Sequence, residues 1–188
     1  MNGKEQTLNS IMENKEMNQD RVFDTFDHFK RWGKVLLKDN REVYDIIKEK
    51  RAEGTLLEAG CGIGTGSLII GTDMATDKLS DNIRFARELY PTLNFDTWDI
   101  GESPYKEKYD VVVCVEAIEH VKKYREGIKN LIASARKEVW ISTPCPQVPE
   151  SPPTNQYHVR EFTEQEFISL TDKKVEVVKP GLYRIICA

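Results

Sequence analysis

The sequence of 188 residues contains no apolar run close to the about 20 residues that a membrane-spanning helix needs. Residues 1–20 are polar and lack the apolar core of a secretory signal peptide. The four cysteines include no C-x-x-C pair, which disfavours both a disulfide framework and a cysteine zinc site. We therefore expect a soluble, cytoplasmic protein that has no membrane association.

Basic residues are not in excess either. The 27 lysines and arginines are outnumbered by 31 aspartates and glutamates, so the net charge is −4. This balance argues against a strong electrostatic attraction to nucleic acid. The length and the 39% hydrophobic content suit one globular domain. We predict a flexible segment at 1–20 and a single domain at 21–188, with N-terminal helices in 21–53 and a sheet core in 54–188.

Short apolar runs alternate with helical patterns beyond Gly54. Near-continuous apolar runs such as "YDVVVCV" are typical of parallel strands that are covered on both faces. The alternation predicts an α/β sandwich of three layers, with an antiparallel edge at the C-terminus. Strands are expected at 55–59, 68–72, 93–98, 109–115, 138–142, 174–178 and 183–187, and helices at 20–32, 40–51, 77–89, 124–136 and 163–170.

The glycine-rich segment "LLEAGCGIGTG" at 56–66 is the strongest functional signal. Gly60, Gly62 and Gly64 allow sharp turns and a close approach of the backbone to a ligand. Asp73 ends the next apolar run and Asp99 the one after, where carboxylates could accept hydrogen bonds from a ribose and an adenine. The nicotinamide pattern G-x-G-x-x-G is absent in every register, which disfavours a dehydrogenase.

These features resemble the class I methyltransferases that depend on S-adenosylmethionine (SAM). The matching motifs, in order, are "EAGCGIG", "GTDM", "WDI", "YDVVVCVEAIEHV", "VWISTP" and "YHVREFTEQEF". The resemblance covers residues 55–167 and implies a Rossmann-like fold with a mostly parallel sheet of about seven strands. It also implies that SAM is the cofactor and that methyl transfer is the reaction.

The resemblance implies contacts for the methionine and ribose parts of SAM. The loop from Gly60 to Gly64, which contains Cys61, would pass under the methionine part. Asp73 would bind the ribose, with Met74 against the adenine. Glu58 would be a structural carboxylate or one that orders the ligand indirectly.

Further contacts are implied beyond the third and fourth strands. Asp99 and Ile100 would hold the edge and the face of the adenine. Glu116 would lie near the methyl group and the acceptor. Each aspartate could instead cap a helix or a turn.

The first crossover departs from the family pattern. Only eight residues separate Gly64 from Asp73, whereas a parallel crossover usually needs a dozen or more. We therefore predict that the first crossover helix is shortened or missing. We favour a deleted helix with a strand at 68–72, and the alternative is a short helix in place of that strand. A deleted helix could weaken SAM binding, so a catalytically silent protein that binds a partner is one alternative function.

Glu116, His120 and His158 are the candidate catalytic residues, since an acceptor that must lose a proton needs a base. With Glu119 they also form an E-x-x-E-H set plus a later histidine, which resembles the metal-dependent 2′-O-methyltransferases of RNA 3′ ends, the Hen family. Our first interpretation has no metal, because "E-x-I-E-H-V" also occurs widely in metal-free relatives. We expect a small molecule, a sugar or another polar acceptor, and a nucleic acid is the less favoured alternative. The oligomeric state is left open.

Overall fold

The computed structural model describes residues 40–147, 153, 155 and 157–187. The flexible segment predicted at 1–20 and the helix predicted at 20–32 lie outside the described residues. The domain boundaries therefore stay a prediction. Within the described residues, every helix is too short or too polar to span a bilayer.

A sheet of seven strands forms the centre of the molecule, in the order β3-β2-β1-β4-β5-β7-β6. The first five strands in the sequence are parallel, whereas β7 is antiparallel to both β5 and β6. This arrangement confirms the predicted fold class. The strands are β1 (Leu56–Ala59), β2 (Met74–Asp77), β3 (Phe95–Thr97), β4 (Tyr109–Val115), β5 (Ala135–Ser142), β6 (Lys174–Lys179) and β7 (Leu182–Ile186).

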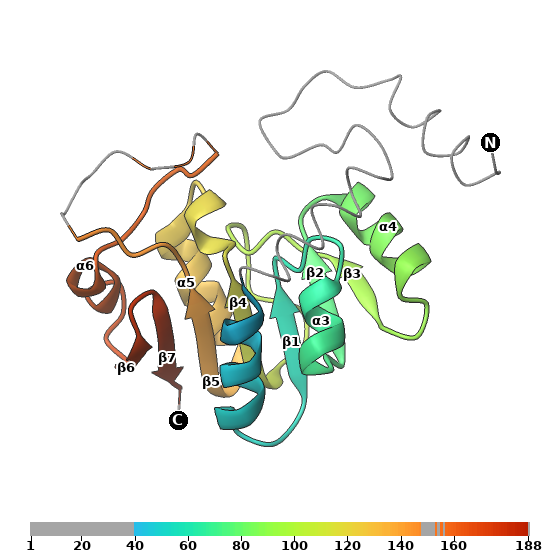
Figure 1. Cartoon of the computed structure of the whole chain (residues 1–188), viewed down its shortest axis with the longest axis horizontal. Helices are drawn as coiled ribbons and strands as arrows, with labels where there is room; N and C mark the ends of the chain where they lie inside the picture. Colours follow the sequence, from blue (N-terminus) through green and yellow to red (C-terminus); the bar gives the residue numbers. More distant parts are fainter. Residues whose placement is uncertain (1–39, 148–152, 154, 156, 188) are drawn as a thin grey trace.

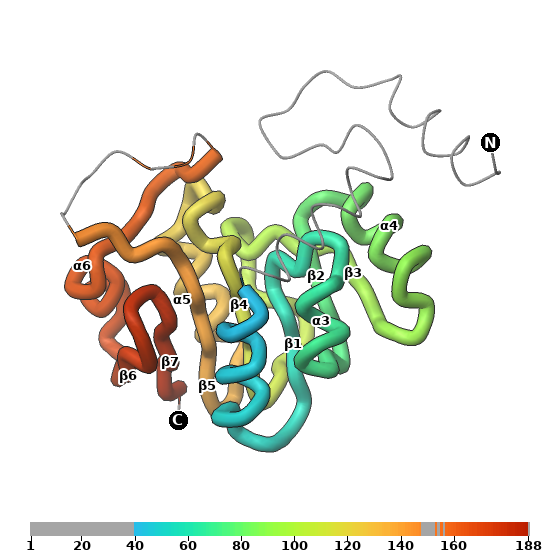
Figure 2. Tube along the Cα trace, in the orientation of Figure 1, coloured from blue at the N-terminus to red at the C-terminus, as the bar shows by residue number. Residues whose placement is uncertain are grey.

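Helices cover both faces of this sheet, and they make the two outer layers (Figure 1). Residues 40–50 are helical, as predicted, and lie on the same side of the sheet as α3 (Figure 2). The other helices are α3 (Thr65–Ile70), α4 (Ser80–Leu89), the 3₁₀ turn η1 (Ile118–His120), α5 (Tyr124–Ser134) and α6 (Glu164–Ile168).

The strand β4 shows why the sheet is buried on both faces. Successive residues of a strand point to opposite faces. Val111 and Val113 pack in one apolar cluster with Ile47, from the helix at 40–50. Val112 packs in the other cluster with Ile128 from α5, so every side chain of the central run meets an apolar layer.

The predicted strand at 68–72 is wrong, because this stretch belongs to helix α3 and the loop that follows it. Gly71 ends the helix with a left-handed φ of 68°, and its N–H donates to the Ser67 carbonyl over 2.9 Å. This is a usual way for a helix to end. The second strand is β2, in the short run "MATD" that carries little apolar sequence. The first crossover helix is therefore short, with six residues, but not missing.

Because β2 begins at Met74, Asp73 and Met74 lie at the opposite end of the parallel strands from the one that the sequence analysis predicted. Met74 begins β2 rather than following it. The Asp73 carboxylate accepts a hydrogen bond over 2.7 Å from the N–H of Leu56, at the start of β1. Both residues thus lie at the amino ends of parallel strands, away from the glycine-rich loop at the carboxyl end of β1.

Candidate active site

The glycine-rich loop leaves β1 at the edge where all five parallel strands end (Figure 1). Gly60, Gly62 and Gly64 have left-handed φ angles of 74°, 55° and 80°, which residues with a Cβ rarely adopt. A Cβ on Gly60 would lie 2.5 Å from the Cβ of Ala117, whereas a Cβ on Gly62 would have nothing within 4 Å. The loop is therefore packed at Gly60 and faces open space at Gly62.

Asp77 is the carboxylate that lies beside this loop. It ends β2, and its Oδ2 accepts a hydrogen bond from the Gly62 N–H over 2.9 Å. Its Oδ1 accepts from the N–H of Leu79 over 2.9 Å and from Asn82. Burial raises the pKa of Asp77, while these hydrogen bonds to the carboxylate lower it. A carboxylate offers about four acceptor positions, so three donors leave room for a ligand hydroxyl.

Asp77 therefore stands where we expected Asp73. We predicted Asp73 because we interpreted "LIIGTD" as a strand. Met74 was placed against the adenine for the same reason, but it begins β2 and does not follow it. The signal that could have found Asp77 was Gly71, since a glycine after an apolar helical turn marks a helix end.

Asp99 and Ile100 do lie at the carboxyl edge, beyond β3. Asp99 is exposed, and its Oδ1 accepts a hydrogen bond from the Gly101 N–H over 2.8 Å. Ile100 is buried in the apolar cluster under α5. Asp99 thus lies beyond the third strand, and its carboxylate has the turn-stabilising role that we considered as an alternative. Its contact with an adenine stays a prediction.

Glu58 connects three elements beneath the glycine-rich loop. It is 1% exposed, and its carboxylate accepts hydrogen bonds from Tyr44 Oη over 2.8 Å and from Ser67 Oγ of α3. Burial raises the pKa of Glu58. The position supports the structural role that the sequence indicated, but the two partners are visible only in the tertiary structure.

Glu116 follows β4 and has a φ of 49°, the only left-handed φ of a non-glycine among the described residues. Its N–H donates to the Ser142 carbonyl over 3.0 Å, and its Oε1 accepts from Ser142 Oγ over 2.7 Å. Burial raises the pKa of Glu116. Strained backbone of this kind often marks a functional position.

Two histidines from distant parts of the chain meet next to Glu116. The rings of His120 and His158 have centroids 4.9 Å apart. His158 Nδ1 lies 2.7 Å from Glu161 Oε1, and Glu119 is 1% exposed beside His120. The structure therefore gathers Glu116, Glu119, His120 and His158, and it adds Glu161, which the sequence did not single out.

A family model for methyltransferase domains matches residues 29–174 of the sequence. The chain belongs to the methyltransferase-domain family. The match spans the glycine-rich loop, Asp77, Asp99 and the residues around Glu116. It confirms the resemblance to class I SAM-dependent methyltransferases, and SAM is accordingly the cofactor that the family uses.

A curated relative shows how far the methyltransferase domain matches known proteins in sequence. The ubiquinone biosynthesis O-methyltransferase of Rickettsia akari is 33% identical over 85 residues, which cover 41% of this chain and 34% of that protein. The chain thus matches the curated relatives over about a third of their length.

Solved structures match the methyltransferase domain over a larger part. The SAM-bound amino pentose methyltransferase CalS10 of Micromonospora echinaspora superposes with a TM-score of 0.64 and 14% identity, covering 90% of this chain and 99% of that one. DesVI of Streptomyces venezuelae gives a TM-score of 0.65 and 16% identity, covering 93% and 100%. At these identities the likeness shows the fold.

Proposed function

We propose that the chain transfers a methyl group from SAM to a polar small molecule, such as a sugar. The single observation that carries the proposal is the hydrogen bond from the Gly62 N–H to Asp77 at the carboxyl edge. The glycine-rich loop faces open space at Gly62 and has the Asp77 carboxylate beside it. This arrangement fits SAM, in which the ribose hydroxyls lie next to the extended methionine part. Methyltransfer from such a ligand is the reaction of the family.

Bound SAM would supply a methyl group that a positive sulfur already activates. The protein then mainly aligns the acceptor with that methyl group. We assign the ribose hydroxyls to Asp77 in place of Asp73, and the adenine to Asp99 and Ile100. The methionine part would lie over the loop from Gly60 to Gly64.

The acceptor side of the proposed site comprises Glu116, His120 and His158. When a hydroxyl or an amine takes the methyl group, its proton must leave, and a carboxylate or an imidazole can accept it. The printed names of two similar proteins support the proposal in different ways: an amino pentose methyltransferase supports a sugar as the acceptor, and a ubiquinone biosynthesis O-methyltransferase supports oxygen as the methylated atom. The cytoplasmic location remains part of the proposal.

The test compares two aspartates that lie at opposite ends of the parallel strands. SAM binding is measured by calorimetry for the wild type, Asp77→Asn and Asp73→Asn. Asp77→Asn is expected to weaken SAM binding by about 10- to 100-fold, since a charged acceptor contributes about 1.5–3 kcal/mol. Asp73→Asn serves as the matched control and should leave the dissociation constant within about twofold.

A second measurement addresses the reaction itself. Formation of S-adenosylhomocysteine is followed with a panel of sugars and other polar acceptors. Turnover that Asp77→Asn lowers would support the proposed methyltransferase. Wild-type protein that binds no SAM would instead favour the catalytically silent alternative.

A further inference from the structure

Glu116 lies at the end of β4 that adjoins the glycine-rich loop. Strands β1 and β4 are parallel neighbours, so the segments that follow them leave the sheet at the same edge. Ala117 lies so close to Gly60 that a Cβ on this glycine would be 2.5 Å from the Ala117 Cβ. The segment that carries Glu116 therefore packs against the loop over which the proposed function places the methionine part of SAM.

One serine holds both the backbone and the side chain of Glu116. The Glu116 N–H lies 3.0 Å from the Ser142 carbonyl oxygen and 3.2 Å from Ser142 Oγ, and this Oγ donates to Glu116 Oε1 over 2.7 Å. A hydroxyl can donate and accept at the same time. Ser142 ends β5 and is 1% exposed, so it is a fixed partner. Such contacts can maintain the left-handed φ of 49° at Glu116.

The surroundings of Glu116 favour a negative charge that is available to a ligand. Burial raises the pKa of Glu116, whereas the hydrogen bond from Ser142 and the nearby His158 lower it. His158 already has a carboxylate partner, Glu161, at 2.7 Å. Every buried charged residue that the structure describes is an aspartate or a glutamate, so no buried lysine or arginine there neutralises Glu116. Because Oε1 accepts from Ser142, Oε2 is the oxygen that can face a ligand.

The charge on sulfur is the property of SAM that a carboxylate can distinguish. SAM carries a positive charge on its sulfur, whereas S-adenosylhomocysteine, which remains after methyl transfer, has a neutral sulfur. The two molecules share the ribose and the adenine, so Asp77 and Asp99 would contact parts that are identical in both. A carboxylate attracts a cation more strongly in a partly buried site than in water, because the effective dielectric constant is lower.

We propose that Glu116, positioned by Ser142, recognises the positive sulfur of SAM and makes the protein bind SAM more tightly than S-adenosylhomocysteine. Glu116 thus determines specificity for the charge of the donor, and Ser142 is a positioning residue. After methyl transfer the attraction to the sulfur is lost, which favours the exchange of the product for new SAM. The inference rests on the proposed function, because it requires SAM to lie over the loop from Gly60 to Gly64.

The test measures the dissociation constants of SAM and S-adenosylhomocysteine for the full chain by calorimetry at pH 8. We expect the wild type to bind SAM about tenfold more tightly or better. Glu116→Gln keeps the size of the side chain and removes its charge. It should weaken SAM binding by about tenfold and change the binding of S-adenosylhomocysteine by less than about twofold. Sinefungin, which has an amino group in place of the methyl-bearing sulfur centre, should lose affinity as SAM does.

The role of Ser142 is tested with two substitutions. Ser142→Ala should lower the preference for SAM by about three- to tenfold, since it removes one hydrogen bond to a charged group. Ser142→Thr keeps the hydroxyl and should retain the preference of the wild type. A serine with a structural role alone would instead weaken both ligands equally.

Glu126→Gln is the matched control. It removes the same charge from the first turn of α5, where Glu126 is 56% exposed and paired with Lys129. Because such a charge is screened by solvent, the preference for SAM should stay within about twofold of the wild type.

The outcomes separate this inference from the proposed function. Circular dichroism checks that each variant is folded, and the two Ser142 variants decide the matter if Glu116→Gln is not. Equal losses of SAM and S-adenosylhomocysteine affinity, or no loss of either, overturn the inference while SAM binding that depends on Asp77 still supports the proposed function. A preference for SAM that depends on Glu116, in a protein that methylates no acceptor, overturns the proposed function alone. A wild type that binds neither ligand overturns both.

Discussion

At the scale of single residues, nearby glycines of the glycine-rich loop have different roles. Gly60 and Gly62 both have left-handed φ angles, but only Gly60 faces another side chain within the protein. The sequence pattern alone gives both the same meaning. The difference separates a glycine required for packing from one that keeps a ligand surface open.

The two alanine substitutions are predicted to affect mainly different properties, the stability of the fold for Gly60 and the binding of SAM for Gly62. Gly60→Ala should lower the free energy of unfolding by about 2–4 kcal/mol, through the strained φ and the contact with Ala117. Gly62→Ala should cost only about 1–2 kcal/mol of stability, yet weaken SAM binding by about tenfold or more. Urea denaturation and calorimetry measure the two quantities, and equal losses of SAM affinity in both variants would contradict the assignment.

At the scale of elements, buried polar contacts fasten helices to the sheet. Glu58 in β1 accepts hydrogen bonds from Tyr44, in the helix at 40–50, and from Ser67 in α3. Gly66 permits this packing, since a Cβ there would lie 2.1 Å from the Tyr44 ring. The short α3 is thus positioned by the neighbouring helix as well as by its own apolar residues.

The loss of stability caused by Glu58→Gln should depend on pH, because Glu58 is a buried carboxylate. Burial raises the pKa of Glu58 in the folded protein above the ordinary value of 4.5. The stabilising contribution of the protonated form is complete below 4.5 and is lost as the pH rises through the folded pKa. The substitution should therefore cost more stability at acidic than at alkaline pH. Urea denaturation of wild type and variant at both ends of that range measures the difference, and a cost that grows with pH would contradict it.

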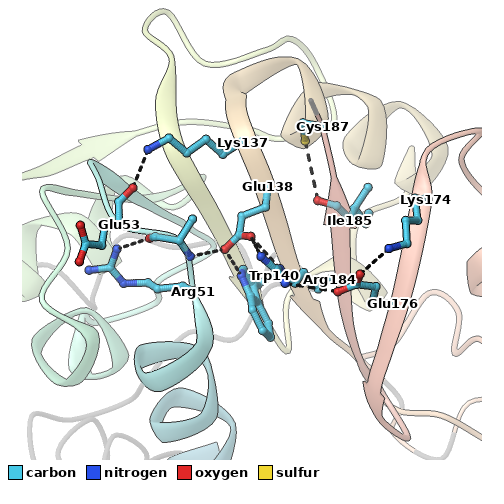
Figure 3. A network of polar contacts seen from close by, with 11 residues as sticks. Arg51, Glu53, Lys137, Glu138, Trp140, Lys174, Glu176, Arg184, Ile185 and Cys187 are labelled. Atoms are coloured by element: carbon cyan, nitrogen blue, oxygen red, sulfur yellow. Dashed lines mark hydrogen bonds and ion pairs between the residues drawn. The ribbon is translucent and has the colours of Figure 1, made fainter.

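At the scale of the whole molecule, Glu138 joins segments that are far apart in the sequence (Figure 3). This buried carboxylate in β5 accepts hydrogen bonds from the Ala52 N–H over 2.7 Å and from Trp140 Nε1 over 2.8 Å. It also pairs with Arg184 of β7, at 2.7 Å from the Nε. The network links the residues just after the helix at 40–50 to the hairpin of β6 and β7.

Removing this link should destabilise the molecule as a unit. Glu138→Ala leaves the buried Trp140 Nε1 and the partly buried Ala52 N–H without their acceptor and leaves Arg184 with Glu176 as its carboxylate partner, so we expect a loss of about 2–4 kcal/mol in the free energy of unfolding. Asp45→Asn is the control, because it breaks the exposed pair of Arg41 and Asp45 within one helix and should cost less than about 0.5 kcal/mol. Urea denaturation compares the variants, and similar losses would show that the Glu138 network contributes little.

The sequence by itself determined the α/β class, the glycine-rich loop and most elements. The strand β4 has the predicted bounds, and Thr163, where the last helix was predicted to begin, is the N-cap of α6 in a capping box that Glu166 completes. These features were readable because they depend on local chemistry: alternating burial in a strand, capping hydrogen bonds and glycine conformation. The short first crossover helix was also predictable, from the eight residues that separate Gly64 from Asp73.

Only the tertiary structure decided which carboxylate meets the glycine-rich loop and which side chains face His158. The run at 68–72 is apolar enough for a strand, and the pairing of "MATD" with β1 depends on contacts across the sheet. His120 approaches His158 because backbone bonds join η1 to the segment after β5, whereas Glu161 lies only three residues beyond His158 on that segment. Such contacts between distant residues leave no periodic pattern in the sequence, since they depend on the register of the strands and the path of the loops.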